Sequence, residues 1–324
     1  MEASEYIAYY VLSESYKSSR VRSSQVLAIS HDEVNRFVCN SDFSGKHLFD
    51  KVSGAIELPG GTLSIDDVVI DKPFSDSEHT ELVGYFWSGR HHKQVKGINL
   101  IVLHYTDNKG ISVPVNFRVY RHSDGKTKND YFQQMCREVF NWGLKPAFVT
   151  MDSWYSGVDN LKFLRNQEVG ILTGLENNRI VSTMPHLYEK LQDIAIPSEG
   201  LYSHLKAFDY IKVFGTVDKE GHPRHYGIYL PDTEQLKTAD TEMFKTLKKQ
   251  HWQIEEMFRA IKQLVHAGHF FVRRTEAIKT HLFLVLRGFQ KLILMAKDEI
   301  IQSLYQLQNQ LFLQAQRKFI QQFA

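Results

Sequence analysis

Residues 62–71 read TLSIDDVVID, a segment rich in β-branched residues in which apolar and polar side chains alternate. This pattern predicts a β-strand. Two neighbouring acids, Asp66 and Asp67, lie inside the segment, where an apolar environment makes a charge costly unless it has a partner or a metal ion. Successive side chains of a strand point to opposite faces of a sheet, so only one of the two acids can face a common site.

Downstream of this strand, the pattern predicts two more strands joined by a hairpin turn, followed by alternating helices and strands. This order, βββαβαβ with an antiparallel start and a parallel continuation, predicts an α/β fold with a ribonuclease H-like mixed sheet and helices on its faces. The expected segments are strands at 97–105 and 111–120, a helix at 127–143, a strand at 146–152, a helix at about 156–167 and a strand at 169–175.

A Pro/Gly break at residues 57–61, ELPGG, marks a boundary before the first strand. Residues 1–56 have the apolar spacing of helices, whereas residues 176–240 contain short strand-like runs and turns. We therefore expect a small helical unit at 1–56 and a second domain at 62–324. Within the second domain, 176–240 is predicted to be a β-rich insertion and 241–324 to form the C-terminal helices.

The helical unit contains a pattern typical of helix-turn-helix motifs. Ser30 and Glu33, three residues apart, match a capping box that starts a helix directly after a tight turn. In a DNA-binding motif, this second helix would present Asn35 and Arg36 to a major groove. The alternative is an ordinary helical hairpin that packs on the next domain.

Composition narrows the class of protein but leaves its partner open. The 324 residues are 43% hydrophobic and have a formal net charge of +2, which is too small to identify a nucleic-acid-binding protein. No apolar run reaches the roughly 18 residues of a membrane span, and the N-terminus does not resemble a signal peptide. The only cysteines, Cys39 and Cys136, have no CxxC spacing, which excludes a disulfide scaffold and a cysteine zinc site. We expect a cytoplasmic protein without a membrane partner.

Three carboxylates are the most informative candidates for chemistry. Besides the Asp66/Asp67 pair, Asp152 ends the apolar strand PAFVTMD, and Glu255 lies on the predicted helix HWQIEEMFRAIKQL. Hard oxygen ligands suit Mg²⁺ or Mn²⁺, and two such ions about 3.5–4 Å apart support phosphoryl transfer. Each acid alone is more typical of a turn, a helix cap or the surface. Only their convergence in space would make a metal site.

Several phrases resemble the DDE transposases of bacterial insertion sequences, in the group with a C-terminal Tyr/Arg/Glu/Lys signature. The resemblance covers residues 20–290 approximately, and its phrases are specific. They are ISHDEVNRF, SIDDVVIDKP, VKGINLIVLHY, VTMDSWYSGVDNLKFL, GLENNRIVS, HWQIEEMFRAIKQ and RTEAIKTHLFL.

The resemblance implies that Asp66, Asp152 and Glu255 are the catalytic residues and hold Mg²⁺ or Mn²⁺, with two ions expected. The family pattern aligns better with Asp66 than with Asp67, and both remain open. It also implies a transposase that binds the terminal inverted repeats of a mobile element, cleaves the DNA ends with metal-activated water and joins the 3′-hydroxyls to target DNA. Double-stranded DNA is then the partner, a homodimer on DNA is expected, and the site of action is the bacterial nucleoid.

The signature also implies DNA contacts from the helix that carries the acid. Lys262 matches the signature lysine, and Arg259 lies between it and the glutamate. Lys248 and His251 occupy the positions where the signature has Tyr and Arg. The way in which the family processes the DNA end is therefore not assigned to this chain from the resemblance. Both side chains remain able to contact phosphate. The departures leave two other functions open: an inactive or repurposed DNA-binding relative, and a ribonuclease H-fold nuclease.

Overall fold

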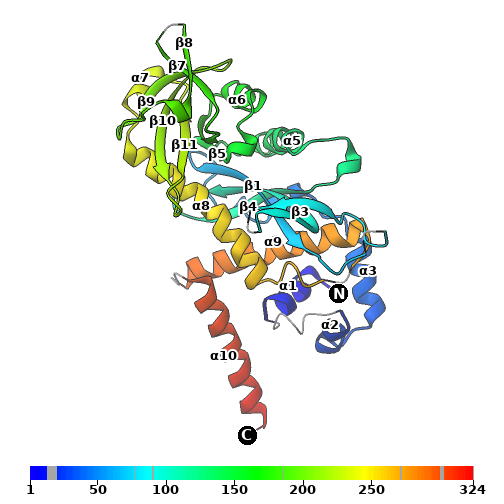
Figure 1. The fold of residues 1–324 in the computed structure, drawn as a ribbon. Helices are drawn as coiled ribbons and strands as arrows, with labels where there is room; N and C mark the ends of the chain where they lie inside the picture. The colour runs from blue at the N-terminus through cyan, green and yellow to red at the C-terminus, as the bar shows by residue number, and fades with distance from the viewer. Residues whose placement is uncertain are drawn as a thin grey trace.

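The computed structural model describes residues 1–12, 20–76, 78–89, 91–184, 186–270, 272–299 and 303–323. Figure 1 shows a long mixed sheet with helices on both faces and a helical N-terminal region beneath it. Residues 13–19 of the predicted 1–56 unit lie outside the described ranges.

The centre of the sheet has the strand order β4-β3-β1-β5-β6. Its antiparallel part consists of β1 (Thr62–Asp71), β3 (Lys93–Thr106) and β4 (Ser112–Val119). Its parallel part adds β5 (Phe148–Met151) and β6 (Gly170–Leu175) beside β1. The mixed sheet expected from the sequence, with an antiparallel start and a parallel continuation, is therefore present.

One strand was missed by the sequence reasoning. The short run β2 (Gly84–Ser88) pairs antiparallel with the first residues of β3, so four strands rather than three precede the first helix of the sheet. Its side chains alternate strictly, because Phe86 is buried while Tyr85 and Trp87 are 62% exposed. The run YFWS at residues 85–88, between two glycines, was a weak signal for a strand. Strands are recognised from sequence by period and length together, and this run is short.

The turn between β3 and β4 forms as the sequence predicts. The Asp107 Oδ1 atom accepts backbone N–H bonds from Lys109 at 2.9 Å and from Ile111 at 2.8 Å. Gly110 has a φ of +82°, a conformation that glycine adopts without a steric penalty. This turn reverses the chain and aligns the two strands.

The β-rich insertion extends the same sheet. Its strand β11 pairs antiparallel with β6, and the order continues through β10, β9, β7 and β8. The bounds are β7 (Ile180–Met184), β8 (Leu187–Lys190), β9 (Leu201–Leu205), β10 (Tyr210–Val217) and β11 (Pro223–Tyr229). The short helix α7 (Thr233–Thr238) follows and returns the chain to the centre.

Helices cover the two faces of the sheet separately. On one face, α5 (Lys128–Asn141) and α6 (Val158–Arg165) pack with Leu63 and Ile65 of β1. On the opposite face, α8 (Thr241–Gln263) and α9 (Thr275–Asp298) pack with Ile70 of β1 and the even-numbered apolar residues of β3. Odd and even positions of β1 therefore face different helices.

The N-terminal helices belong to the same core as α8 and α9. They are α1 (Ala3–Leu12), α2 (Arg20–Leu27), α3 (His31–Asn40) and α4 (Gly45–Asp50). Tyr6 of α1 is buried, and its hydroxyl lies 2.9 Å from the ring Nδ1 of His281 on α9. One half of the predicted capping box forms, because the Ser30 Oγ accepts the Glu33 backbone N–H at 3.0 Å. The Glu33 carboxylate instead accepts the N-terminal ammonium of Met1 at 2.6 Å.

The last helix, α10 (Leu304–Phe323), packs on α9 and α1 through its first turns and then extends away from the rest of the protein (Figure 1). Leu307 in its second turn is fully buried, whereas Phe319 and Ile320 are exposed. Among the described residues, no helix has the length and apolar character needed to span a bilayer.

Candidate active site

A cleft of about 1120 Å³ lies where β1, the end of β5, β2, the start of α5 and α8 come together. Its lining includes all three predicted carboxylates, Asp66, Asp152 and Glu255, together with Asp67. Segments nearly 190 residues apart in the sequence thus contribute acids to one space.

Asp66 is an even-numbered residue of β1 and belongs to the face that α8 covers. Its Oδ1 atom accepts the backbone N–H of Asp67 at 2.7 Å. Burial raises the pKa of the Asp66 carboxyl well above its usual range, and the negative charges of Asp152 and Glu255 raise it further. Asp152 and Glu255 are therefore close enough to Asp66 to disfavour its ionised form.

Asp67 belongs to the opposite face and is already neutralised by the protein. Its carboxylate accepts hydrogen bonds from the Lys128 ammonium at 2.7 Å, the Asn99 amide at 2.6 Å and the Tyr155 hydroxyl at 3.0 Å. The Lys128–Asp67 ion pair is largely buried. A carboxylate with this many donors has little need of a metal ion.

Asp152 is fixed by the turn that follows β5. Its Oδ1 atom caps the 3₁₀ turn at Ser153–Tyr155 and accepts the backbone N–H groups of Trp154 at 3.0 Å and Tyr155 at 3.4 Å. Burial and the nearby charge of Asp67 raise the pKa of Asp152 to about 6, although the backbone donors and Lys128 oppose this shift. One carboxylate oxygen is thus oriented by the backbone, and Oδ2 has no hydrogen-bond partner within the described residues.

Helix α8 is held over β1 by polar contacts rather than by apolar packing alone. Its first turn is capped by Asp240, whose side chain accepts the Met243 N–H at 2.8 Å. Farther along, the Thr62 hydroxyl donates to the Gln250 side chain at 2.5 Å, and the Thr150 hydroxyl lies 3.1 Å from the His251 ring. These contacts fix the rotation of α8.

One turn beyond these contacts, Glu255 is an exposed residue of α8 that lines the cleft. Its neighbour Glu256 instead lines a separate cavity. The geometry therefore favours Glu255 over Glu256 as the acid of the cleft.

The predicted DNA-contacting residues divide into two groups. Arg259, Lys262 and His251 line the cleft with the acids. Burial lowers the pKa of His251 to about 4, so its ring is neutral at physiological pH and contributes polarity rather than charge.

The other three do not line the cleft. The Lys248 ammonium lies 4.7 Å from the ring centroid of Tyr226 on β11 and so faces the insertion. Asn35 and Arg36 are on α3, and the Asn35 amide lies 2.9 Å from the His31 ring. Their role in DNA recognition stays a prediction.

Several side chains of the site were not found by sequence reasoning. Lys128 at the start of α5 and Asn99 in the middle of β3 meet Asp67 only in the folded chain. Tyr85 and Trp87 of β2 also line the cleft, and both are 62% exposed. The aromatic run of β2 was the one signal that pointed to two of them, because exposed aromatic side chains in a cleft are typical of binding surfaces.

The donor set fits a divalent cation, although the site is not a closed coordination shell. Within the part of the chain that the structure describes, no group of three or more Asp, Glu, His or Cys side chains is arranged so that it could hold a metal ion as it stands. The fit lies in the chemistry: Asp66 is half-buried beside like charges and lacks a basic partner in the described residues. Carboxylate oxygens of this kind are the ligands that Mg²⁺ and Mn²⁺ prefer.

Comparisons with known proteins show the family of the chain and its fold. The family model described as "Transposase DDE domain" matches residues 61–287, which is more than two thirds of the chain. No curated protein sequence matches the chain.

Two solved structures are similar in fold. A piggyBac transposase synaptic complex with hairpin DNA aligns with a TM-score of 0.55 at 12% identity, over 99% of this chain and 71% of that one. This likeness confirms the ribonuclease H-like mixed α/β fold. A Drosophila P element transposase strand transfer complex aligns with a TM-score of 0.30 at 11% identity, over 90% of this chain and 64% of that one, a score too low to carry an argument.

The raised pKa of Asp152 should make the free energy of unfolding depend on pH. Between the ordinary pKa of 3.8 and about 6, the folded chain holds more protons than the unfolded chain. The free energy of unfolding therefore falls as the pH rises through this window. In metal-free buffer, Asp152→Asn should remove much of this fall and should increase the free energy of unfolding at pH 7 by about 1–2 kcal/mol.

Urea denaturation at pH 4.5 and pH 7 measures this effect. Asp42→Asn, which changes an exposed acid on the loop between α3 and α4, is the matched control and should behave like the unmodified protein. An Asp152→Asn protein with the same pH dependence as the Asp42→Asn protein would show that Asp152 is not electrostatically strained.

Proposed function

Because the chain belongs to the family of transposases with a DDE domain, we propose that it catalyses DNA transposition. It would bind the terminal inverted repeats of a mobile element, cleave the DNA ends and join the 3′-hydroxyls to target DNA. The observation that carries this proposal is the convergence of Asp66, Asp152 and Glu255 in one cleft whose rim holds Arg259 and Lys262. Acids at the floor and cations at the rim suit a substrate whose reacting phosphate is flanked by further phosphates.

Asp66, Asp152 and Glu255 are the residues that would hold the divalent ions, Mg²⁺ or Mn²⁺. Such ions supply activation of a water or a 3′-hydroxyl and stabilisation of the leaving oxygen. Asp66 is preferred to Asp67 because the three donors on Asp67 already satisfy it. The chain's own contribution is to hold Asp66 beside two other acids, with no basic side chain paired to Asp66 within the described residues.

The network around Asp67 has a positioning role in this proposal. Tyr155 connects Asp67 to the turn that Asp152 caps, and Lys128 connects it to the start of α5. The Lys128 ammonium also lies 5.4 Å from the ring centroid of Trp154. This network therefore connects β1, α5 and the turn after β5, and so fixes the positions of these elements beside the proposed reacting groups.

Lys262 is proposed to contact DNA beside the reacting phosphate. It follows Glu255 by seven residues, so both side chains emerge from the same side of α8 about 10 Å apart along the helix axis. Arg259 lies between them and also lines the cleft. An ammonium is a flexible point charge that suits contact with a phosphate neighbouring the scissile one.

The finer assignments are proposals that rest on the sequence. We place the chain among the transposases of bacterial insertion sequences because of the W-x-I-E-x-x-F-R phrase at Trp252 to Arg259. Lys248 and His251 replace the signature's Tyr and Arg, and they lie at the insertion and beside Thr150. End recognition by α3 through Asn35 and Arg36, and pairing of two protomers on DNA, belong to the same proposal.

Asp152→Asn separates chemistry from binding. The substitution keeps the shape of the side chain but removes a ligand charge, so cleavage and strand joining in the presence of Mg²⁺ should fall by at least about 100-fold. Affinity for the DNA that flanks the gene should change little, because phosphate contacts provide most of it.

Gel-shift and cleavage assays on the same preparation test this prediction. Binding without cleavage by the unmodified protein would indicate an inactive DNA-binding relative. Cleavage without strand joining would indicate a nuclease, and equal activity in the Asp152→Asn protein would contradict the assigned site.

Lys262→Ala tests the proposed phosphate contact. It should weaken binding to cleaved DNA ends and reduce the slope of log affinity against log salt by about 0.9, the value for one phosphate contact. Lys162→Ala, on the exposed side of α6 across the sheet, is the matched control and should leave the slope unchanged. Equal salt slopes in the two variants would show that Lys262 does not contact a phosphate.

A further inference from the structure

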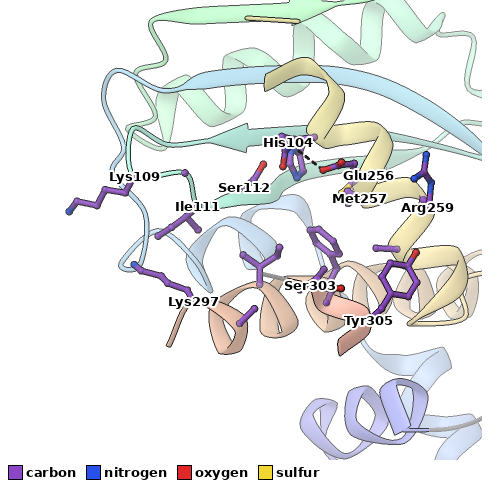
Figure 2. Close-up of a pocket in the computed structure, with 17 residues that line it drawn as sticks. His104, Lys109, Ile111, Ser112, Glu256, Met257, Arg259, Lys297, Ser303 and Tyr305 are labelled. Carbon is purple, nitrogen blue, oxygen red and sulfur yellow. Dashed lines mark hydrogen bonds between the residues drawn. The ribbon is translucent and has the colours of Figure 1, made fainter. Parts of the chain in front are cut away.

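A second cavity of about 430 Å³ lies on the other side of α8 from the cleft. It is lined by α8, α9, the start of α10 and the β3–β4 hairpin (Figure 2). Arg259 lines both the cavity and the cleft. Its volume falls within the range of sites that bind small molecules.

The deepest polar group of the cavity is the imidazole of His104. This residue of β3 is 1% exposed, and neither ring nitrogen has a hydrogen-bond partner within the described residues. Burial lowers the pKa of His104 to about 3, so the ring is neutral and offers one donor and one acceptor. Buried polar groups without partners are rare in native proteins because leaving them unpaired costs free energy.

A comparison with His281 shows that His104 is unusual within this protein. His281 is equally buried, but its Nδ1 lies 2.9 Å from the Tyr6 hydroxyl and its Nε2 lies 3.3 Å from the Ala267 carbonyl oxygen. Both nitrogens of His281 therefore have partners. Within the described residues, His104 lines this cavity and neither of its ring nitrogens is paired.

The backbone is irregular where His104 enters the cavity. The pairing of β3 with β4 shifts register between Leu103 and His104, and His104 then faces Pro114. Bulges of this kind redirect a side chain and are common beside functional sites. The carbonyl of Pro114 accepts the Gln290 amide of α9 at 2.7 Å, so the irregular segment is held in place from the helix side.

Opposite His104, the wall of the cavity is apolar. It is formed by side chains of α8 and α9, namely Met257, Ala260, Phe289, Ile293 and Ala296. The Phe289 ring centroid lies 6.3 Å from the His104 ring centroid. A ligand in this space would therefore bury an aromatic or branched aliphatic body against α9.

The rim carries a net positive charge. In Figure 2, Arg259 and Lys297 lie at opposite ends of the cavity. Neither has an acidic partner within the described ranges, whereas Lys109 is paired with Glu57 at 2.8 Å. The one acid of the lining, Glu256, accepts a hydrogen bond from Gln253 at 3.0 Å.

We propose that this cavity binds a small amphipathic organic anion. Its aromatic or branched body would pack on Met257 and Phe289, a hydroxyl or similar polar group would hydrogen-bond to His104, and its anionic group would pair with Lys297 or Arg259. This site is separate from the DNA cleft and does not depend on the proposed transposition activity. Because α8 and Arg259 border both spaces, its occupant lies one helix away from the reacting acids.

The first test is binding of a defined probe to the full chain. The probe 4-hydroxybenzoate carries an aromatic body, a hydroxyl and a carboxylate, benzoate lacks the hydroxyl and p-cresol lacks the carboxylate. Titration calorimetry should show saturable binding of 4-hydroxybenzoate, and affinities at least about fivefold weaker for each analogue. Lys297→Ala should weaken 4-hydroxybenzoate binding by a similar factor, because it removes one rim cation.

The second test compares two histidine variants without any probe. His104→Leu replaces an unpaired polar ring by an apolar side chain. It should raise the melting temperature and weaken 4-hydroxybenzoate binding at least about fivefold, to the level of benzoate. His281→Leu, the matched control, breaks two hydrogen bonds and should lower the melting temperature. A lower melting temperature for His104→Leu would mean that internal water satisfies the ring, and it would overturn the proposal. The absence of saturable binding by all three probes, or unchanged binding in the His104→Leu protein, would overturn it as well.

Discussion

Neighbouring side chains of a β-strand point to opposite faces of its sheet, and in β1 this constraint separates two adjacent acids. Asp67 faces α5, where Lys128, Asn99 and Tyr155 neutralise and hold it. Asp66 faces α8, where the like charges of Asp152 and Glu255 raise its pKa. One acid thus stabilises the fold, and the other is left electrostatically strained in a cleft. Pairs of acids whose environments differ in this way are typical of catalytic sites.

Helix α8 packs on β1 and connects this strand to the helices behind it. Contacts from Thr62 and Thr150 fix its rotation, so that Glu255 faces the cleft while Glu256 faces the second cavity. The N-terminal helices and α9 pack behind it in one core. The position of Glu255 is therefore set by a core that includes both the first and the last helix of the chain. A ligand in the second cavity would contact the side of α8 that faces away from the cleft.

Sequence reasoning succeeded where the determining interactions are local. The Asp107 turn, the Ser30 cap and the short apolar strand before Asp152 each depend on a few consecutive residues, and each forms as expected. It failed where the partners are distant in sequence. Neither Lys128 nor Asn99 carries any local sign that it will meet Asp67, and the cavity around His104 is assembled from four elements. The cap at Ser30 shows where a helix starts but does not show what that helix binds.

The central claim is that Asp66, rather than Asp67, holds the divalent ion. Electron paramagnetic resonance of Mn²⁺ titrated into the unmodified protein, Asp66→Asn and Asp67→Asn tests it most directly. The account predicts that Asp66→Asn loses the bound Mn²⁺ signal while remaining folded. It predicts that Asp67→Asn keeps the signal, with a lower melting temperature because the buried Lys128 ammonium loses its ionised partner. Loss of Mn²⁺ binding in the Asp67→Asn protein, together with retained binding in the Asp66→Asn protein, would contradict it.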